Sequence, residues 1–250
     1  MQAILLASGQ NTRVQNVYPD LPKVMFPLGD KPYLGYYLEL LFNEGITEVI
    51  ILVSYQGHKI KEYVEARPEF KAGKVKIIEQ PEGYGPAGAL CHIEDMLQER
   101  FFLLYCDILF KTDLKAVFNC LDTEFEACTL ITKDEYKMWE TMEITIDENA
   151  NMVTNFHPDA FDHENGWMDI GQVYRKSVLE TLKKIDPYNR EALNKLAWSE
   201  FITNGRLTYF KVGPVLDIGT EKNYNTTNEI FGREGLKALD EVEPSSSPRR

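Results

Sequence analysis

Two basic residues follow the first apolar segment of the chain. The segment "AILLA" ends just before Ser8-Gly9, and the polar loop "SGQNTRV" that follows carries Arg13, with Lys23 further on. Backbone N–H groups in a loop after a strand can bind phosphate oxygens, and the two cations would add positive charge. The loop matches neither the P-loop nor the GxGxxG pattern, so by itself it is more often structural than functional.

Two aspartates stand directly after apolar runs in separate halves of the chain. Asp107 follows "FFLLYC", and Asp217 follows "PVL". Each alone is also typical of a turn or of a helix N-cap, where a side-chain oxygen accepts backbone hydrogen bonds. A strand-end aspartate in each half is harder to explain in that way, so both are candidate functional residues.

The apolar segments around these residues predict a repeated strand–helix pattern in residues 1–122. Strands are expected at residues 3–7, "EVIILVS", "KVKIIEQ" and "FFLLYCD", and helices from Pro32 to a C-cap at Gly45, at 58–66, and from "PEGYGPAGAL" to about Gln98. This order gives βαβ units and parallel strands, whose ligands bind at the carboxyl ends. Those ends are marked by Ser8-Gly9, Ser54, Gln80 and Asp107. We therefore expect one shared site there.

The pattern changes after about residue 123. Strands are expected at "EACTLITK", "ETMEITID", "NMVTNFHP", "MDIGQVYRK", "RLTYFKVG" and "PVLDIG", and helices at 190–203 and 220–232. The tail "EVEPSSSPRR" is polar and rich in Pro and Ser, which is typical of disorder. No internal repeat is visible, so the second half is a continuation of the same domain.

Composition limits the classes of function. The chain has 250 residues, 44% of them hydrophobic, and a net charge of −12 with a pI near 4.9. Such an acidic chain is unlike nucleic-acid binders, whose affinity comes largely from basic contacts to phosphate. The four cysteines lack metal-ligand spacing, and no apolar stretch is long enough to span a membrane. We expect a cytoplasmic protein with reduced thiols that binds neither nucleic acid nor membranes.

Five motifs occur in an order that is similar to that of one enzyme family. They are "LLASGQNTRV", "PDLPKVMFPLGDKPYL", "QPEGYGPAGAL", "LLYCDILF" and "LDIGTEKNY". Their order and the PK…P…KP spacing resemble the sugar-1-phosphate nucleotidyltransferases (nucleotide-sugar pyrophosphorylases), and most closely the heptose- and mannose-1-phosphate guanylyltransferase branch. The resemblance is strong over about residues 1–110 and looser over 165–232.

This resemblance implies a fold and a reaction. The fold is a three-layer α/β/α, Rossmann-like arrangement around a mixed, mostly parallel sheet. In the reaction, an oxygen of a sugar-1-phosphate attacks the α-phosphorus of a nucleoside triphosphate and releases pyrophosphate. We predict one domain at residues 1–235, with a nucleotide-binding half at 1–122 and a sugar-phosphate-binding half at 123–235, followed by a disordered tail at 236–250.

The resemblance also implies roles for single residues. Arg13 would hold the β- and γ-phosphates, and Lys23 would reach the α-phosphate or the attacking phosphate. Asp107 and Asp217 would bind Mg²⁺, which prefers hard oxygen ligands. The nucleotide is expected to contact Leu6, Ala7, Ser8, Gly9, Asn11, Gln80, Gly85 and Gly88, and the sugar phosphate to contact His157, Asp169 and Gly171.

Two of these expectations concern recognition. Gln80 can pair with a base edge as donor and as acceptor, and Gly85 and Gly88 would let the base approach the backbone. Asp169 could accept hydrogen bonds from sugar hydroxyls. The sequence does not separate GTP from UTP, CTP or dTTP.

Three residues depart from the family pattern. Asn11 replaces the second glycine of the phosphate loop, although Asn tolerates a positive φ better than most residues. Cys106 stands where glycine is common and could narrow the metal site. His157 lies where many relatives carry a lysine, and neutral histidine is a poorer phosphate clamp.

These departures leave two other functions open. The first is transfer to a non-sugar phosphate such as phosphocholine, because Asp169 and the aromatic residues Trp167 and Tyr174 suit a cationic head group. The second is a regulatory homologue that binds a nucleotide or nucleotide-sugar without turnover. A homodimer is an assembly that the sequence allows without specifying it.

Overall fold

The computed structural model describes residues 1–9, 13–14, 16–54, 56–121, 125–133, 143–157, 166–189, 193 and 198–240. Within these residues the N-terminal half contains, in order, β1 (Gln2–Ala7), β2 (Pro27–Leu28), β3 (Lys31–Pro32), α1 (Tyr33–Asn43), β4 (Glu48–Val53), α2 (Gly57–Glu65), α3 (Pro68–Lys71), β5 (Val75–Glu79), α4 (Pro86–His92), β6 (Arg100–Tyr105), β7 (Ile108–Leu109) and α5 (Leu114–Asn119). Short 3₁₀ helices occupy η1 (Lys23–Met25) and η2 (Glu94–Met96). The predicted strand–helix alternation is confirmed.

The C-terminal half contains longer antiparallel segments. Its elements are β8 (Ala127–Thr132), β9 (Glu143–Asp147), β10 (Met152–His157), β11 (Trp167–Arg175), η3 (Lys176–Val178), α6 (Leu179–Leu182), α7 (Trp198–Thr203), β12 (Leu207–Lys211), β13 (Leu216–Asp217), α8 (Glu221–Glu234) and η5 (Gly235–Leu239). The helix expected at 190–203 is described from residue 198, because 190–192 and 194–197 lie outside the described residues.

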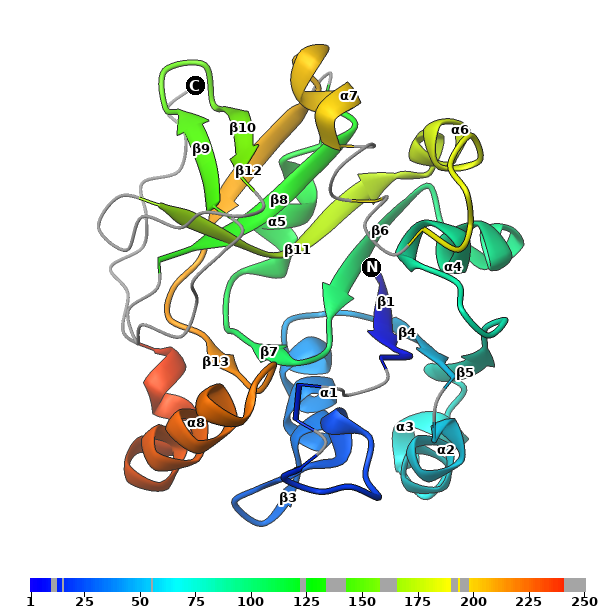
Figure 1. Ribbon diagram of the computed structural model, residues 1–250, viewed down its shortest axis with the longest axis vertical. Helices are drawn as coiled ribbons and strands as arrows, with labels where there is room; N and C mark the ends of the chain where they lie inside the picture. The colour runs from blue at the N-terminus through cyan, green and yellow to red at the C-terminus, as the bar shows by residue number, and fades with distance from the viewer. Residues whose placement is uncertain are drawn as a thin grey trace.

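Nine of the described strands form one mixed sheet. Its order is β10-β9-β11-β6-β1-β4-β5, and β8 pairs with both β11 and β12. The strands β6, β1, β4 and β5 are parallel, whereas β11 runs antiparallel to β6. The carboxyl ends of the four parallel strands therefore meet at one edge of the sheet (Figure 1).

Helices cover both faces of this sheet, as a three-layer fold requires. Alternate residues of β1 face opposite sides, so Leu5 joins one hydrophobic cluster and Ile4 the other. Helices α1, α2, α5 and α8 supply residues to the first cluster, and α4, α6 and α7 supply residues to the second. The predicted α/β/α class is confirmed.

Two predicted boundaries are wrong. The helix expected to reach Gln98 ends at His92, and a separate 3₁₀ turn follows. The disordered tail was expected from residue 236, but Ala238 and Leu239 are buried, with 2% and 3% of their surface exposed. These two apolar residues belong to the first cluster. In the sequence they stand directly before a polar segment, and the predicted tail therefore began too early.

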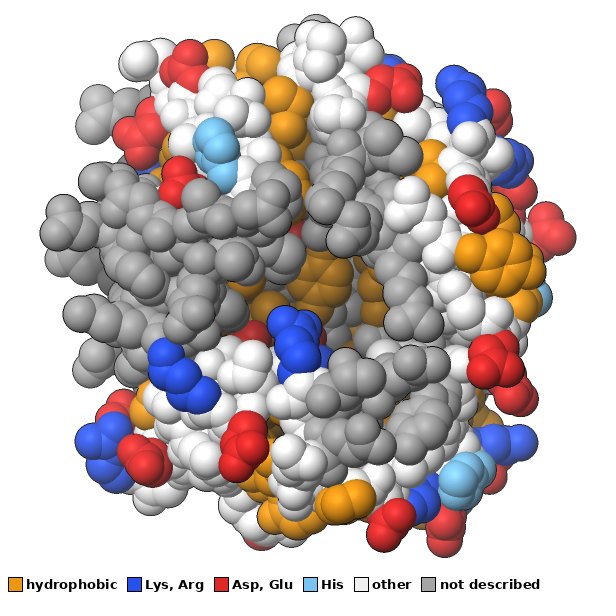
Figure 2. Space-filling model, in the orientation of Figure 1, with side chains coloured by type: hydrophobic (Ala, Val, Ile, Leu, Met, Phe, Trp, Pro, Cys, Tyr) orange, Lys and Arg blue, Asp and Glu red, His pale blue; other side chains and the backbone are white. Residues whose placement is uncertain are grey.

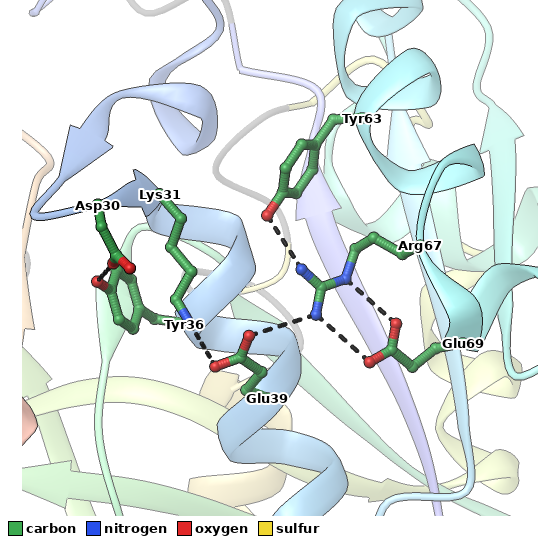
Figure 3. Close-up of polar contacts among 7 residues, drawn as sticks. All are labelled: Asp30, Lys31, Tyr36, Glu39, Tyr63, Arg67 and Glu69. Carbon is green, nitrogen blue, oxygen red and sulfur yellow. Dashed lines mark hydrogen bonds and ion pairs between the residues drawn. The ribbon is translucent and has the colours of Figure 1, made fainter.

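A polar network on the surface fixes α1 against α2 and α3 (Figure 3). Glu39 of α1 accepts hydrogen bonds from Lys31 at 2.5 Å and from Arg67 at 3.5 Å. Arg67 also donates to the hydroxyl of Tyr63 at 3.0 Å. A Cβ at Gly35 would lie 2.5 Å from that hydroxyl, so a glycine is needed for this close approach. Because Lys31 is the first residue of β3, the network also holds the β2–β3 hairpin that follows Lys23 in the chain.

The described helices include none that is both long enough and apolar enough to cross a lipid bilayer.

Candidate active site

An open cleft of about 640 Å³ lies at the carboxyl ends of the parallel strands. Figure 2 shows a hollow near the middle of this face, with hydrophobic side chains in its depth and charged side chains at its lower rim. The described residues that line the cleft are Leu6, Ala7, Ser8, Gly9, Arg13, Pro22, Lys23, Val24, Ser54, Glu79, Gln80, Glu82, Gly83, Tyr84, Gly85, Pro86, Tyr105, Cys106 and Asp107. The structure therefore brings together most of the predicted nucleotide-binding residues.

The loop "SGQNTRV", residues 8–14, here called the phosphate loop, begins where β1 ends. Ser8 and Gly9 line the cleft, and a Cβ at Gly9 would meet no atom of the described residues within 4 Å, so none of them blocks a ligand from the backbone there. Arg13 is exposed at the cleft and is followed by the buried Val14, which anchors this part of the loop. Asn11 lies outside the described residues, so the effect of its side chain stays a prediction.

Lys23 and Asp107 form an ion pair inside the cleft. The Nζ atom of Lys23, on η1, lies 2.5 Å from Oδ2 of Asp107, just after β6. Burial acts to lower the pKa of Lys23, but the charge of Asp107 outweighs burial and raises that pKa above its usual value. In turn, burial acts to raise the pKa of Asp107, but Lys23 keeps it below the usual value. Both groups are therefore charged near neutral pH.

Asp217 lies beside this pair although it is far away in the sequence. Strands β7 and β13 pair antiparallel, and the amide of Ile218 donates to the carbonyl of Asp107 at 3.0 Å. A Cβ at Gly219 would lie 3.1 Å from Oδ1 of Asp217 and 3.7 Å from Oδ2 of Asp107. Both carboxylates thus face the small space beside Gly219.

The surroundings of Asp217 favour an added cation. Burial, followed by the charge of Asp107, raises the pKa of Asp217 to about 6, although Asn223 and the amide of Gly219 donate hydrogen bonds to it. The Oδ1 atom of Asn223 is buried without a described partner. Two carboxylates and a spare amide oxygen are hard oxygen donors, which suit Mg²⁺. No group of three or more His, Cys, Asp or Glu side chains with metal-site geometry occurs among the described residues.

Tyr33 connects β13, which carries Asp217, with the segment from Asp107 to β7. It is fully buried at the start of α1, and its hydroxyl donates to the carbonyl of Leu216 at 2.5 Å. The same hydroxyl lies 3.1 Å from the carbonyl of Asp107 and accepts from the amide of Leu109 at 2.5 Å. Tyr33 therefore sets the separation of β7 and β13.

Cys106 does not obstruct the space between the aspartates. Its thiol is 2% exposed and lies 2.8 Å from the carbonyl oxygen of Leu6, to which it donates. The sulfur is thus held against β1, and its burial raises the pKa of the thiol. The larger side chain replaces glycine by filling a gap between two strands.

At the other end of the cleft, residues 79–86 form the base loop. Gln80 is 5% exposed, and its Nε2 donates to the carbonyl of Tyr84 at 3.2 Å. Gly85 lines the cleft, as expected. Gly88 does not: a Cβ there would lie 2.5 Å from the carbonyl oxygen of Pro187. The prediction that Gly88 admits the base is therefore wrong, because its bare face packs on the C-terminal half.

Asp169 is buried below the cleft and does not line it. Its carboxylate is 3% exposed and accepts hydrogen bonds from Tyr105 at 2.8 Å, Thr129 at 2.7 Å and Gln172 at 2.6 Å. With its acceptors occupied, the carboxylate holds the Tyr105 ring in the cleft wall and does not itself present oxygens to a sugar. Gly171 also lies outside the described cleft lining, where β11 shifts register against β8. This placement does not by itself support direct sugar contacts by Asp169 and Gly171, which stay predictions.

His157 lies away from the cleft. It ends β10, the outermost strand of the sheet path, and pairs there with Glu143 of β9. It is not among the described residues that line the cleft, and its predicted contact with a sugar phosphate stays a prediction. The strand order, which the sequence does not reveal, places it at the far edge.

The hypothesis of a non-sugar acceptor such as phosphocholine depends on Trp167 and Tyr174, and both rings already have contacts within the fold. The ring of Trp167 already faces the ammonium groups of Lys133 at 4.3 Å and Lys211 at 4.9 Å. Tyr174 is fully buried in the second cluster. The ring of Tyr174 is therefore closed to a head group, and that of Trp167 is already in contact with two cations.

Several cleft residues were not anticipated. Tyr84, Glu82 and Tyr105 line the cleft, and Tyr33 and Asn223 support the aspartates. A signal existed for Tyr105, which directly precedes Cys106-Asp107 at a predicted strand end. No local signal marks Tyr33, because its partners lie far away in the sequence.

Comparison with known proteins gives concordant results. A family model described as nucleotidyl transferase matches residues 2–229. A D-glycero-alpha-D-manno-heptose 1-phosphate guanylyltransferase from Campylobacter jejuni is 39% identical over 114 residues, which are 46% of this chain and 51% of that protein. The match thus spans about half the length of that relative. An enzyme of the same name from Aneurinibacillus thermoaerophilus is 26% identical over 228 residues, covering 90% of this chain and 95% of that protein.

The solved structures agree on the fold. The crystal structure of HddC from Yersinia pseudotuberculosis has a TM-score of 0.72 and 22% identity, and the match covers 92% of this chain and 99% of that one. At this identity the likeness concerns the fold alone.

Proposed function

Because the chain belongs to the nucleotidyl transferase family, we propose that it transfers a nucleoside monophosphate group from a nucleoside triphosphate to a sugar-1-phosphate. One observation carries the proposal: a phosphate loop, the Lys23–Asp107 pair and a second carboxylate, Asp217, converge at one end of a cleft that has a base loop at the other. An oxygen of the sugar phosphate forms the new bond to the α-phosphorus. The bond from that phosphorus to the bridging oxygen breaks, and pyrophosphate leaves.

The residues of the cleft supply charge and position to this displacement. The open backbone at Gly9 and the guanidinium of Arg13 bind the β- and γ-phosphates, and Lys23 neutralises charge that develops around the α-phosphorus. Lys23 must move from Asp107 toward the phosphates, because it is now paired with that carboxylate. Mg²⁺, held by Asp107 and Asp217, would replace the positive charge of Lys23 beside Asp107 and would orient the phosphates.

Guanine is the base that we propose. The two relatives described above are guanylyltransferases, and one of them matches almost the full length of this chain. The base end of the cleft also presents the carboxylates of Glu79 and Glu82. Carboxylates accept hydrogen bonds, and the Watson–Crick edge of guanine offers adjacent N–H donors.

The test is pyrophosphate release from each of GTP, UTP, CTP and dTTP with a panel of hexose- and heptose-1-phosphates, with and without Mg²⁺. We expect release that needs a sugar phosphate and Mg²⁺ and that is fastest with GTP. Nucleotide binding without release from folded protein, across the panel, would contradict the proposal and favour the regulatory homologue. Faster release with phosphocholine than with any sugar phosphate would favour the non-sugar acceptor.

A further inference from the structure

A turn from the C-terminal half packs against the back of the base loop. Residues 186–189, here called the proline turn, follow α6 and the exposed ion pair of Lys183 with Glu94, which has an N–O distance of 2.7 Å. The turn is internally fixed: Oδ1 of Asp186 accepts from the amide of Tyr188 at 3.0 Å, and the carbonyl of Asp186 accepts from the amide of Asn189 at 3.0 Å. These hydrogen bonds give the proline turn a defined conformation of its own.

The proline turn satisfies the backbone of the base loop. Gly85 is the N-cap of α4, with no side chain to cap the helix, and its amide donates to the carbonyl of Pro187 at 2.8 Å. Gly88, on the first turns of α4, lets Pro187 approach to a distance that a Cβ would prevent. The start of α4 is thus seated on Pro187, and this contact fixes where the base loop ends.

The turn also holds an aromatic ring of the cleft wall. Tyr84 lines the cleft, and its ring packs edge-on against Tyr188 with centroids 5.2 Å apart. The Tyr84 ring also packs against the ring of His92, with centroids 6.3 Å apart. The carbonyl of Tyr84 in turn holds Gln80, so a shift of Tyr84 would move the amide side chain at the base end.

Tyr188 contributes little to the hydrophobic core. It is 59% exposed, which is unusual for a large aromatic side chain, and it also lies against Gly83, where a Cβ would be 3.4 Å from its ring. A side chain that remains this exposed gains little burial energy in the fold. Its contacts with Gly83 and Tyr84 are both contacts with the base loop.

The geometry points to Tyr188 and the proline turn as positioning elements for the nucleobase, so that nucleotide affinity is controlled from the half that does not carry the phosphate loop. The inference rests on the proposed function, since it concerns the same cleft. It assigns Tyr188 no contact with the reacting atoms. The effect of Tyr188 is exerted through Tyr84 and Gln80.

The experiment compares Tyr188→Ala, Tyr188→Phe and the control Glu180→Ala, which changes an exposed residue of α6. Calorimetry with Mg²⁺ and whichever of the four nucleoside triphosphates binds wild type most tightly gives Kd, and steady-state assays give KM for each substrate. We expect Tyr188→Ala to raise the nucleotide Kd and KM roughly three- to tenfold, the range of one aromatic pair. The KM for the sugar phosphate, kcat and the thermal midpoint should stay within experimental error of wild type, as should every value for the other two variants.

The outcomes separate this inference from the proposed function. If Tyr188→Ala binds nucleotide as tightly as wild type, the inference is overturned while the proposed function stands. If Tyr188→Ala raises the KM of both substrates equally, a general loosening of the structure replaces the positioning role. If wild type binds none of the nucleotides, both are overturned.

Discussion

Two aspartates, Asp107 just after β6 and Asp169 within β11, lie in different environments. Asp107, just after β6, faces the cleft and is paired with a lysine. Asp169, within the paired strand β11, is enclosed by neutral donors from Tyr105, Thr129 and Gln172. The pKa of Asp107 is lowered by Lys23 against the effect of burial, whereas burial raises that of Asp169 to about 6.

The difference follows from strand direction. Parallel strands end at the same edge, so short polar loops after β1, β5 and β6 reach one space. Strand β11 runs antiparallel to its neighbours β6 and β8, so its ends point the opposite way, and Asp169 lies inside the sheet, where a polar group needs internal partners. The described residues that line the cleft thus all precede β7, and Asp169 of β11 holds one of them, Tyr105, through a hydrogen bond.

The largest expected effect is at Asp107. Asp107→Asn keeps the shape but removes the charge that pairs with Lys23 and the oxygen ligand for Mg²⁺, so kcat should fall by about 10²–10³. Pyrophosphate release measures the loss, and Asp95→Asn, at an exposed position of η2, is the control. If folded Asp107→Asn keeps activity within threefold of wild type, then Asp107, like Asp169, does not act in the reaction.

Asp169 should instead govern stability as a function of pH. Because burial raises its pKa from 3.8 to about 6, the folded state holds the proton more tightly, and its contribution to stability is lost as pH rises through about 4–6. Asp169→Asn lacks this dependence, so the unfolding free energy of wild type relative to the variant should fall by roughly 3 kcal/mol between about pH 3.5 and 7.

Urea unfolding across that pH range gives the difference curve for Asp169→Asn. Thr129→Val is a matched comparison: it keeps the carboxylate but removes a donor that lowers the pKa of Asp169, so the pH dependence should remain and extend to higher pH. A difference between wild type and Asp169→Asn that is the same at every pH would show that Asp169 is not buried as a shifted acid.

Tyr33→Phe tests the join between the halves. The variant leaves the carbonyl of Leu216 and the amide of Leu109 without their partner, which should destabilise the protein by about 2 kcal/mol. Tyr36→Phe removes a hydroxyl that bonds only to the exposed Asp30 among described partners, and it should lose less than about 1 kcal/mol. Equal losses for the two variants, by chemical denaturation, would contradict the role of Tyr33 as a connector.

The smallest effect is expected at His157. Its place at the outer edge of the sheet predicts that His157→Ala changes kcat/KM less than twofold and stability by no more than about 0.5 kcal/mol. Steady-state assays and thermal unfolding measure both. A large rise in the KM for either substrate would show that His157 contacts that substrate and that the site extends to β10.

What the sequence could predict follows the same division. The continuous apolar runs of β1, β4 and β6 and the residues at their ends are local patterns, so Ser8, Gly9, Lys23 and Asp107 were placed correctly in the cleft. The role of Gly88 depends on Pro187, which only the folded chain brings near. The position of Asp169 depends on the register of β11 against β8, including a shift that no sequence pattern announces.

The hydrogen bond from Tyr33 to Leu216 has a consequence for biosynthesis. It joins residues 183 positions apart, and Asp217 enters the site on the same short strand. Contacts so distant in sequence close large loops and form late in folding. A ribosome-bound chain that has emerged only to Asp107 already carries the phosphate loop and Lys23, but it lacks the second carboxylate. The pair of carboxylates should therefore be complete only after Asp217 has emerged and β13 has paired with β7.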